Sequence, residues 1–238
     1  MFFKLQSSIK NVVFDLDNTL IDTNQTFQTA FRESSLFLSQ ACIHQTPEHI
    51  FQLVSKVNQA LQPELLVQPS RVELAVILTA KILKLNPTDK ITKKAINRVK
   101  QIYDTDIPTV FNGATEVLNT FLQLGIRPLL MTHGEENFTW HKLSKTGLLG
   151  KFETKICFSV NYPKESQWKE NFDRLGLKAN QTLVIGDNPQ ADIEATIRLG
   201  TKAIWVSNGQ KRPVSSVENL WQKRVIEINK IADILQLI

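Results

Sequence analysis

Hydrophobic residues along the chain fall into short apolar runs, with segments of helical periodicity between the later ones. Five runs are rich in aliphatic and β-branched side chains, which is typical of buried strands: residues 11–15, 127–132, 155–159, 182–186 and 202–206. The amphipathic segments at 116–124, 167–175 and 192–199 each end just before a glycine, a common helix stop. Strands that alternate with helices predict an α/β fold with a parallel, helix-covered sheet.

Residues 21–108 break this alternation and contain no convincing strand. Their apolar residues recur at helical spacing in four stretches, at 27–38, 49–61, 72–83 and 89–103. We therefore predict two domains, an α/β core of residues 1–20 and 109–238 and a helical domain of residues 21–108. Ligands of open α/β sheets bind beyond the carboxyl ends of strands, so a domain inserted after the first strand is placed to cover such a site.

The net charge of +5 does not indicate a nucleic-acid partner. Much of the positive charge lies in residues 90–100, where lysine and arginine alternate with apolar residues as on the polar face of an amphipathic helix. We find no basic stripe interleaved with aromatic residues. No apolar run approaches the roughly 18 residues of a membrane helix, and the first residues lack the apolar segment of a signal peptide. We expect a cytoplasmic protein, monomeric or dimeric, with no membrane partner.

The first apolar run ends in two acids, Asp15 and Asp17, followed by Thr19. Two carboxylates about 4 Å apart repel by roughly 4 kcal/mol at an effective dielectric constant near 20. A divalent cation with oxygen ligands is the ordinary way to relieve such repulsion. A solvated turn is the alternative explanation, because aspartate and asparagine are common turn residues.

Other polar residues follow the later strands. Thr132 ends the run at 127–132, Lys164 follows 155–159, and Asp187 and Asp192 follow 182–186. Each is ordinary by itself, as a strand cap, a solvated lysine or part of a turn. In a parallel sheet, however, the carboxyl ends of the strands share one edge, so we predict that these side chains gather there with Asp15 and Asp17.

The order of these residues resembles the motifs of the haloacid dehalogenase-like superfamily of hydrolases, over about residues 10–235. The family's first motif matches Asp15 to Thr19, its second ends in Thr132, and its fourth matches Asp187 and Asp192. The helical insert corresponds to the cap domain found between the first and second motifs of one class of the family. The resemblance implies a Rossmann-like parallel core with an α-helical bundle cap.

The resemblance also implies a Mg²⁺-dependent phosphatase of a small phosphorylated metabolite. Asp15 would form an aspartyl-phosphate and Asp17 would act as general acid and base, while Thr132 and Lys164 would hold the phosphoryl oxygens. Mg²⁺ would bind the Asp15 carboxylate, the Asp17 carbonyl and the Asp187 carboxylate. Asp192 would orient the metal waters or Lys164.

Two positions depart from the family pattern. The third motif is often Lys-Pro-x-Pro, but this chain has Tyr162-Pro163-Lys164, which places the lysine slightly late and leaves Lys169 as an alternative. His133 stands where an asparagine or glycine usually follows the threonine, which leaves open whether it contacts the substrate or has only a structural role. A phosphomutase and a non-catalytic binding or regulatory protein remain alternatives. A dehalogenase is disfavoured, because its leaving halide needs no proton and Asp17 is present.

Overall fold

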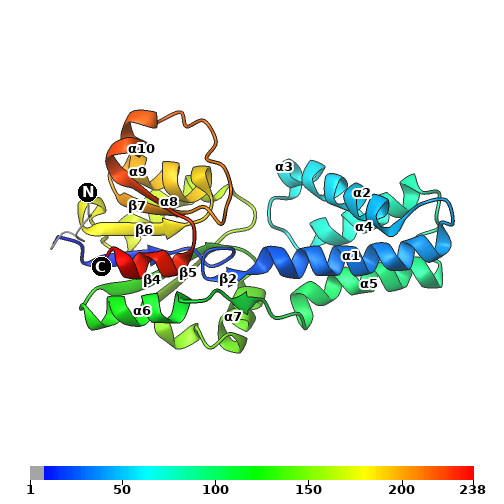
Figure 1. The fold of residues 1–238 in the computed structure, drawn as a ribbon, viewed down its shortest axis with the longest axis horizontal. Helices are drawn as coiled ribbons and strands as arrows, with labels where there is room; N and C mark the ends of the chain where they lie inside the picture. The colour runs from blue at the N-terminus through cyan, green and yellow to red at the C-terminus, as the bar shows by residue number, and fades with distance from the viewer. Residues whose placement is uncertain (1–7) are drawn as a thin grey trace. The chain divides into compact units, whose positions relative to one another are not determined.

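The chain contains a six-stranded parallel sheet with the Asp15 strand in its interior. The computed structural model describes residues 8–238 (Figure 1), and the strands of the sheet lie in the order β5-β4-β1-β6-β7-β8. All neighbouring pairs are parallel, which confirms the predicted α/β class. The strands are β1 (Asn11–Phe14), β4 (Arg127–His133), β5 (Thr154–Phe158), β6 (Thr182–Gly186), β7 (Lys202–Val206) and β8 (Val225–Ile228).

Helices cover both faces of this sheet. Val13 packs in a cluster with Trp168 of α8 (Lys164–Arg174), whereas the next residue, Phe14, places its ring 5.8 Å from that of Phe121 in α6 (Ala114–Gln123). Successive side chains of a strand point to opposite faces, so α8 and α6 lie on opposite sides of β1. Burial on both faces explains the unbroken apolar run that precedes Asp15.

The remaining helices of this part of the chain extend the two layers. α9 (Ala195–Leu199) packs against α8, and α10 (Glu218–Arg224) packs against α9. The 3₁₀-helix Ile231–Gln236 packs against α6. Two further short 3₁₀-helices, Leu149–Lys151 and Ala179–Gln181, precede β5 and β6.

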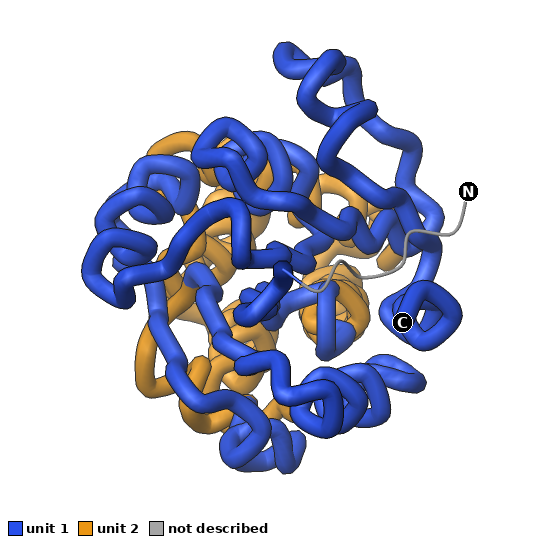
Figure 2. The backbone as a smooth tube through the Cα atoms, turned by 90° about the vertical axis from the view of Figure 1, so that its left-hand side faces the viewer, with its two compact units in different colours: residues 1–22, 109–133, 143–238 blue, residues 23–108, 134–142 orange. Residues whose placement is uncertain are grey.

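A second compact unit contains residues 23–108 and 134–142 (Figure 2). Its helices are α1 (Thr23–Ala41), α2 (Pro47–Ala60), α3 (Gln62–Leu65), α4 (Ser70–Ile82) and α5 (Lys90–Asp104), and it includes most of α7 (Glu136–Lys145). α1 packs against α2 and α5, and α4 packs against the same two helices, so four amphipathic helices enclose one apolar core. The α2 helix begins as its sequence indicates, with Pro47 in its first turn and the Thr46 hydroxyl accepting a hydrogen bond from the His49 amide.

Several short elements differ from the sequence-based expectations. The expectation of no strand in residues 21–108 is wrong at β2 (Ile21–Asp22), which pairs antiparallel with β3 (Thr109–Val110). Two residues are too few to show a periodicity. The edge strand β8 and helix α7 were also not predicted, and the helix expected from residue 192 begins earlier, as the π-helix Pro189–Glu194.

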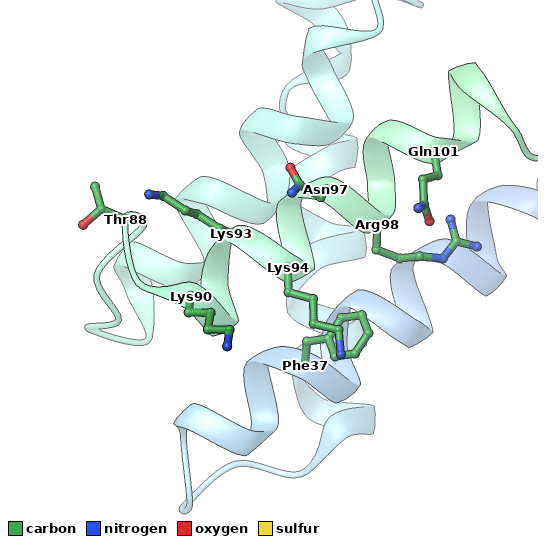
Figure 3. A pocket seen from close by; sticks show the side chains of 8 residues that line it. All are labelled: Phe37, Thr88, Lys90, Lys93, Lys94, Asn97, Arg98 and Gln101. Atoms are coloured by element: carbon green, nitrogen blue, oxygen red, sulfur yellow. The ribbon is translucent and has the colours of Figure 1, made fainter.

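The basic residues of α5 form a polar face, as predicted. Lys90, Lys93 and Lys94 are exposed and line a pocket of about 740 Å³ on the helical unit, and Lys94 lies 4.3 Å from the centre of the Phe37 ring (Figure 3). Arg98, in the same pocket, is paired with Glu33 and Asp106. No helix among residues 8–238 has the length and apolar character needed to cross a bilayer.

Candidate functional site

The end of β1 carries a buried cluster of opposite charges. The Lys164 Nζ atom lies 2.5 Å from Asp15 Oδ1 and 2.5 Å from Asp192 Oδ1. All three side chains are at least nine-tenths buried. Asp15 directly follows β1, and its amide donates to the Ile185 carbonyl, which extends the pairing of β1 with β6 by one residue. Asp15 and Lys164, which are 149 positions apart in the sequence, thus meet at one edge of the sheet.

Burial and neighbouring charges set the protonation of this cluster. The pKa of Asp15 is raised to about 6, because the upward effect of burial, with a smaller one from Asp192, exceeds the downward effect of the Lys164 ammonium. Burial acts to lower the pKa of Lys164, but Asp15 and Asp192 outweigh it and hold that pKa above its ordinary value. Lys164 is therefore cationic at neutral pH, and Asp15 is ionised only above a mildly acidic pH.

Asp187 adds a third carboxylate to the cluster. Oxygens of Asp15, Asp187 and Asp192 all lie within 4.8 Å of one another. Burial, Asp15 and Asp192 raise the pKa of Asp187 well above its usual value. One ammonium faces three carboxyl groups, and carboxyl oxygens gathered in this way can hold a metal ion.

The oxygens of Asp192 are already engaged within the protein. Its Oδ1 pairs with Lys164, and its Oδ2 accepts a hydrogen bond of 3.1 Å from the Asn188 amide. Asp187 is consequently better placed than Asp192 to hold a cation together with Asp15. Asp17 is half-buried, and its charge acts to raise the pKa of both of these residues.

Thr132 and His133 end β4, the strand beside β1. The Thr132 hydroxyl is buried and has no hydrogen-bond partner among residues 8–238, a state that costs roughly 1–3 kcal/mol unless a ligand meets it. His133 Nε2 lies 2.9 Å from the Ser159 carbonyl, so this nitrogen carries the hydrogen. Burial and the Lys164 charge lower the pKa of His133, which favours the neutral ring.

The structure separates the two lysine candidates for the third motif. Lys164 is buried beside Asp15, whereas Lys169 is exposed and pairs with Asp173 at 3.3 Å on the surface of α8. Of the residues predicted to gather at the sheet edge, Asp15, Lys164, Asp187 and Asp192 do so.

Buried tryptophans hold the loop that carries Asp187 and Asp192, and the sequence analysis missed them. The Trp205 indole donates to the Asp187 carbonyl at 2.8 Å, and the Trp168 indole donates to the Ala191 carbonyl at 2.6 Å. Trp205 lies opposite Gly186 in the β6–β7 register. No local sequence pattern links residues this far apart, because the connection comes from strand pairing for Trp205 and from the packing of α8 for Trp168.

Gly186 is required by close packing rather than by its own backbone angles. A Cβ atom at this position would lie 2.6 Å from Asp192 Cβ, which is closer than side chains approach one another. We expect Gly186→Ala to displace Asp192 from Lys164, to lower stability by about 1–3 kcal/mol and to reduce activity, as measured by urea unfolding and steady-state kinetics. Gly150→Ala is the control, because no atom of residues 8–238 lies within 4 Å of its added Cβ. Equal effects of the two substitutions would contradict this packing argument.

Comparisons with known proteins agree with these features. A family model described as haloacid dehalogenase-like hydrolase matches residues 9–200. The chain is 25% identical over 234 residues to a glyceraldehyde 3-phosphate phosphatase of Pyrococcus abyssi, covering 97% of this chain and 94% of the relative. It is 24% identical over 226 residues to an N-acylneuraminate-9-phosphatase of Mus musculus, covering 88% and 87%.

The same fold occurs in a solved structure. A haloacid dehalogenase-like family hydrolase from Xanthomonas campestris superposes with a TM-score of 0.75 at 15% identity, covering 97% of this chain and 92% of that chain. At this identity, the likeness concerns the fold alone.

Proposed function

The chain belongs to the haloacid dehalogenase-like hydrolases, and on that premise we propose that it hydrolyses small phosphate monoesters through an aspartyl-phosphate on Asp15. The observation that carries the proposal is the buried contact of 2.5 Å between the Asp15 carboxylate and the Lys164 ammonium, beside the acidic cluster. A nucleophile, a cation for phosphoryl oxygens and oxygen ligands for a metal then lie at one sheet edge.

In the first step, an Asp15 oxygen attacks phosphorus while the bond from phosphorus to the ester oxygen breaks. Asp17 donates a proton to that leaving oxygen, which departs as an alcohol. Lys164 and the Thr132 hydroxyl bind the phosphoryl oxygens, and the buried, unpartnered state of that hydroxyl supports this role. Phosphoryl transfer depends mainly on such positioning and charge stabilisation.

In the second step, water hydrolyses the aspartyl-phosphate. Asp17 accepts a proton from the water as its oxygen attacks phosphorus, and the bond between phosphorus and Asp15 breaks. Inorganic phosphate leaves, and both carboxyl groups return to their starting states. The presence of Asp17 as a proton donor favours a phosphatase over a dehalogenase, because a halide leaves without taking up a proton.

The acidic cluster is suited to hold Mg²⁺. We assign its ligands to the Asp15 and Asp187 carboxylates and the Asp17 main-chain carbonyl, with Asp192 positioning Lys164 through their contact of 2.5 Å. A bound Mg²⁺ would neutralise charge on the phosphoryl oxygens. The helical unit, formed from residues 23–108 and 134–142, is proposed as the cap that selects the substrate.

Two relatives, named for different substrates, support a proposal for the substrate class. One is a glyceraldehyde 3-phosphate phosphatase and the other an N-acylneuraminate-9-phosphatase. Both names denote phosphate monoesters of small oxygen-rich metabolites. We therefore propose a phosphorylated sugar or sugar-like metabolite as the substrate of this chain.

The test is phosphate release from a panel of sugar phosphates and an aryl phosphate, with Mg²⁺ and with EDTA. We expect hydrolysis of at least one ester that stops when the metal is removed. Release of halide from a 2-haloacid with no hydrolysis of any phosphate ester would contradict the proposal. Movement of phosphate between sugar positions without its release would instead indicate a mutase.

Mg²⁺ should stabilise the protein more strongly as the pH rises. The pKa of Asp15 is about 6 in the folded protein, against an ordinary value of 3.8, so the folded state binds this proton more tightly than the unfolded state. Without metal, the protonated Asp15 therefore contributes its full stabilisation below pH 3.8, and this stabilisation is lost as the pH rises through 6. This loss is of the order of 3 kcal/mol. Asp187 shifts in the same direction.

A cation that binds the ionised carboxylates offsets this loss. At a Mg²⁺ concentration about 100 times the Kd, the gain is roughly 2.7 kcal/mol. We expect the Mg²⁺-induced rise in Tm to be larger at about pH 7.5 than at about pH 5, two values that lie on either side of the Asp15 pKa of about 6. Asp187→Asn should remove most of the rise. A rise that is independent of pH, or that survives in Asp187→Asn, would contradict the metal assignment.

A further inference from the structure

Lys164 directly follows a loop with little regular structure. Residues 159–163 connect β5 to α8, and Lys164 is the first residue of that helix. The one proline of the loop, Pro163, precedes Lys164, whereas the Lys-Pro-x-Pro pattern places two prolines after the lysine, where they would restrict the backbone. Other contacts must therefore fix the loop for Lys164 to lie 2.5 Å from both carboxylates.

The side chain of Gln167 binds the backbone of this loop at both ends. Its Oε1 accepts a hydrogen bond of 2.8 Å from the Ser159 amide. Its Nε2 lies within donating distance of three carbonyls, at 3.1 Å from Ser159, 3.0 Å from Tyr162 and 3.3 Å from Pro163. One primary amide thus joins the first loop residue to the two residues that precede Lys164.

His133 holds the same loop from the neighbouring strand. Its Nε2 lies 2.9 Å from the Ser159 carbonyl, the atom that also faces Gln167 Nε2. A carbonyl oxygen accepts two hydrogen bonds, so both donors are accommodated. Because His133 directly follows Thr132 in β4, this contact also ties the loop to the strand end that carries the buried hydroxyl.

We propose that Gln167 is a positioning residue that fixes Lys164 against Asp15, with His133 as its partner at Ser159. This inference rests on the proposed function for its effect on catalysis, but not for its effect on Lys164 itself. Gln167 acts through the loop, since its own contacts are with backbone atoms of residues 159–163. The amide takes over the restraint that prolines give in the usual third motif.

Two substitutions separate the contributions of the amide. Gln167→Leu removes every hydrogen bond of the side chain at similar size, and Gln167→Glu keeps the acceptor for the Ser159 amide while removing the donors. We expect kcat to fall about 10- to 100-fold in Gln167→Leu, because small displacements of catalytic groups are costly. The fall in Gln167→Glu should be comparable, since the carboxylate repels the three carbonyls. The matched control is Glu170→Gln, an exposed position one turn further along α8.

A double-mutant cycle tests whether Gln167 acts through Lys164. In the Lys164→Met background, adding Gln167→Leu should change kcat by less than about twofold, because the group that it positions is gone. Full additivity of the two effects, or unchanged kcat in Gln167→Leu with an active wild-type enzyme, would overturn the proposal.

The position of Lys164 can also be measured without any activity. The rate at which an amine-reactive reagent labels Lys164, relative to exposed Lys169 in the same helix, is read by peptide mass spectrometry. We expect this ratio to rise at least severalfold in Gln167→Leu and to stay constant in Glu170→Gln. An unchanged ratio in Gln167→Leu overturns the inference, whereas a raised ratio in a protein that hydrolyses no phosphate ester refutes only the proposed function.

Discussion

Replacing Asp15 by asparagine is expected to abolish phosphate release, with kcat lowered by at least about 10⁴-fold. The substitution keeps the shape of the side chain but removes the nucleophilic oxygen, and loss of an attacking group is among the most damaging single changes in an enzyme. The variant should remain folded, since asparagine removes a carboxylate from a cluster with excess negative charge. Steady-state phosphate release and thermal unfolding measure the two effects.

The control for Asp15→Asn is Asp173→Asn. Asp173 is an acid of α8 whose side chain is 70% exposed and pairs with Lys169 on the surface. Its substitution should leave kcat within a factor of about two, as surface ion pairs contribute little. Substantial activity in Asp15→Asn, with no contaminating phosphatase, would refute Asp15 as the nucleophile.

Replacing Lys164 by methionine should reduce both activity and stability. Asp15 and Asp192 each lie 2.5 Å from the Lys164 ammonium. Methionine fills similar space but leaves these two carboxylates without their shared counterion. Breaking a buried ion pair from one side costs about 3–5 kcal/mol of stability. Loss of one group that stabilises transition-state charge lowers kcat roughly 10²- to 10³-fold. Urea unfolding and steady-state kinetics give the two values.

Lys169→Met is the matched control for Lys164→Met. Both lysines belong to α8, but Lys169 is 77% exposed whereas Lys164 is 6% exposed. We expect Lys169→Met to change stability by less than about 0.5 kcal/mol and to leave kcat unchanged. A larger loss of activity in Lys169→Met than in Lys164→Met would reverse the assignment of the third motif.

The acidic centre could be predicted from the sequence because the pattern that marks each of its residues lies in the adjacent strand. Asp15 and Asp187 each follow an apolar run directly, and the rule that parallel strands end at one edge then brings them together without further knowledge. Lys164 was harder, because it is separated from β5 by a loop of irregular structure. Its burial against Asp15 is decided by contacts between distant residues.

The supporting contacts could not be predicted for the same reason. The bond from Trp205 to the Asp187 carbonyl requires the register between β6 and β7, and periodicity does not specify register between strands. The edge strand β8 is partly exposed and so lacks the continuous apolar run that marked β1. Pairs as short as β2 and β3 depend wholly on their partners.

The central claim is that Asp15 carries the phosphoryl group during turnover. The most direct measurement is acid quenching of the enzyme during hydrolysis of its best substrate, followed by mass spectrometry of the peptide that contains Asp15. The account predicts the added mass of one phosphoryl group on Asp15 in the wild-type protein and none in Asp15→Asn. Rapid turnover without any modification of Asp15, or a phosphoryl group on another residue, would contradict it.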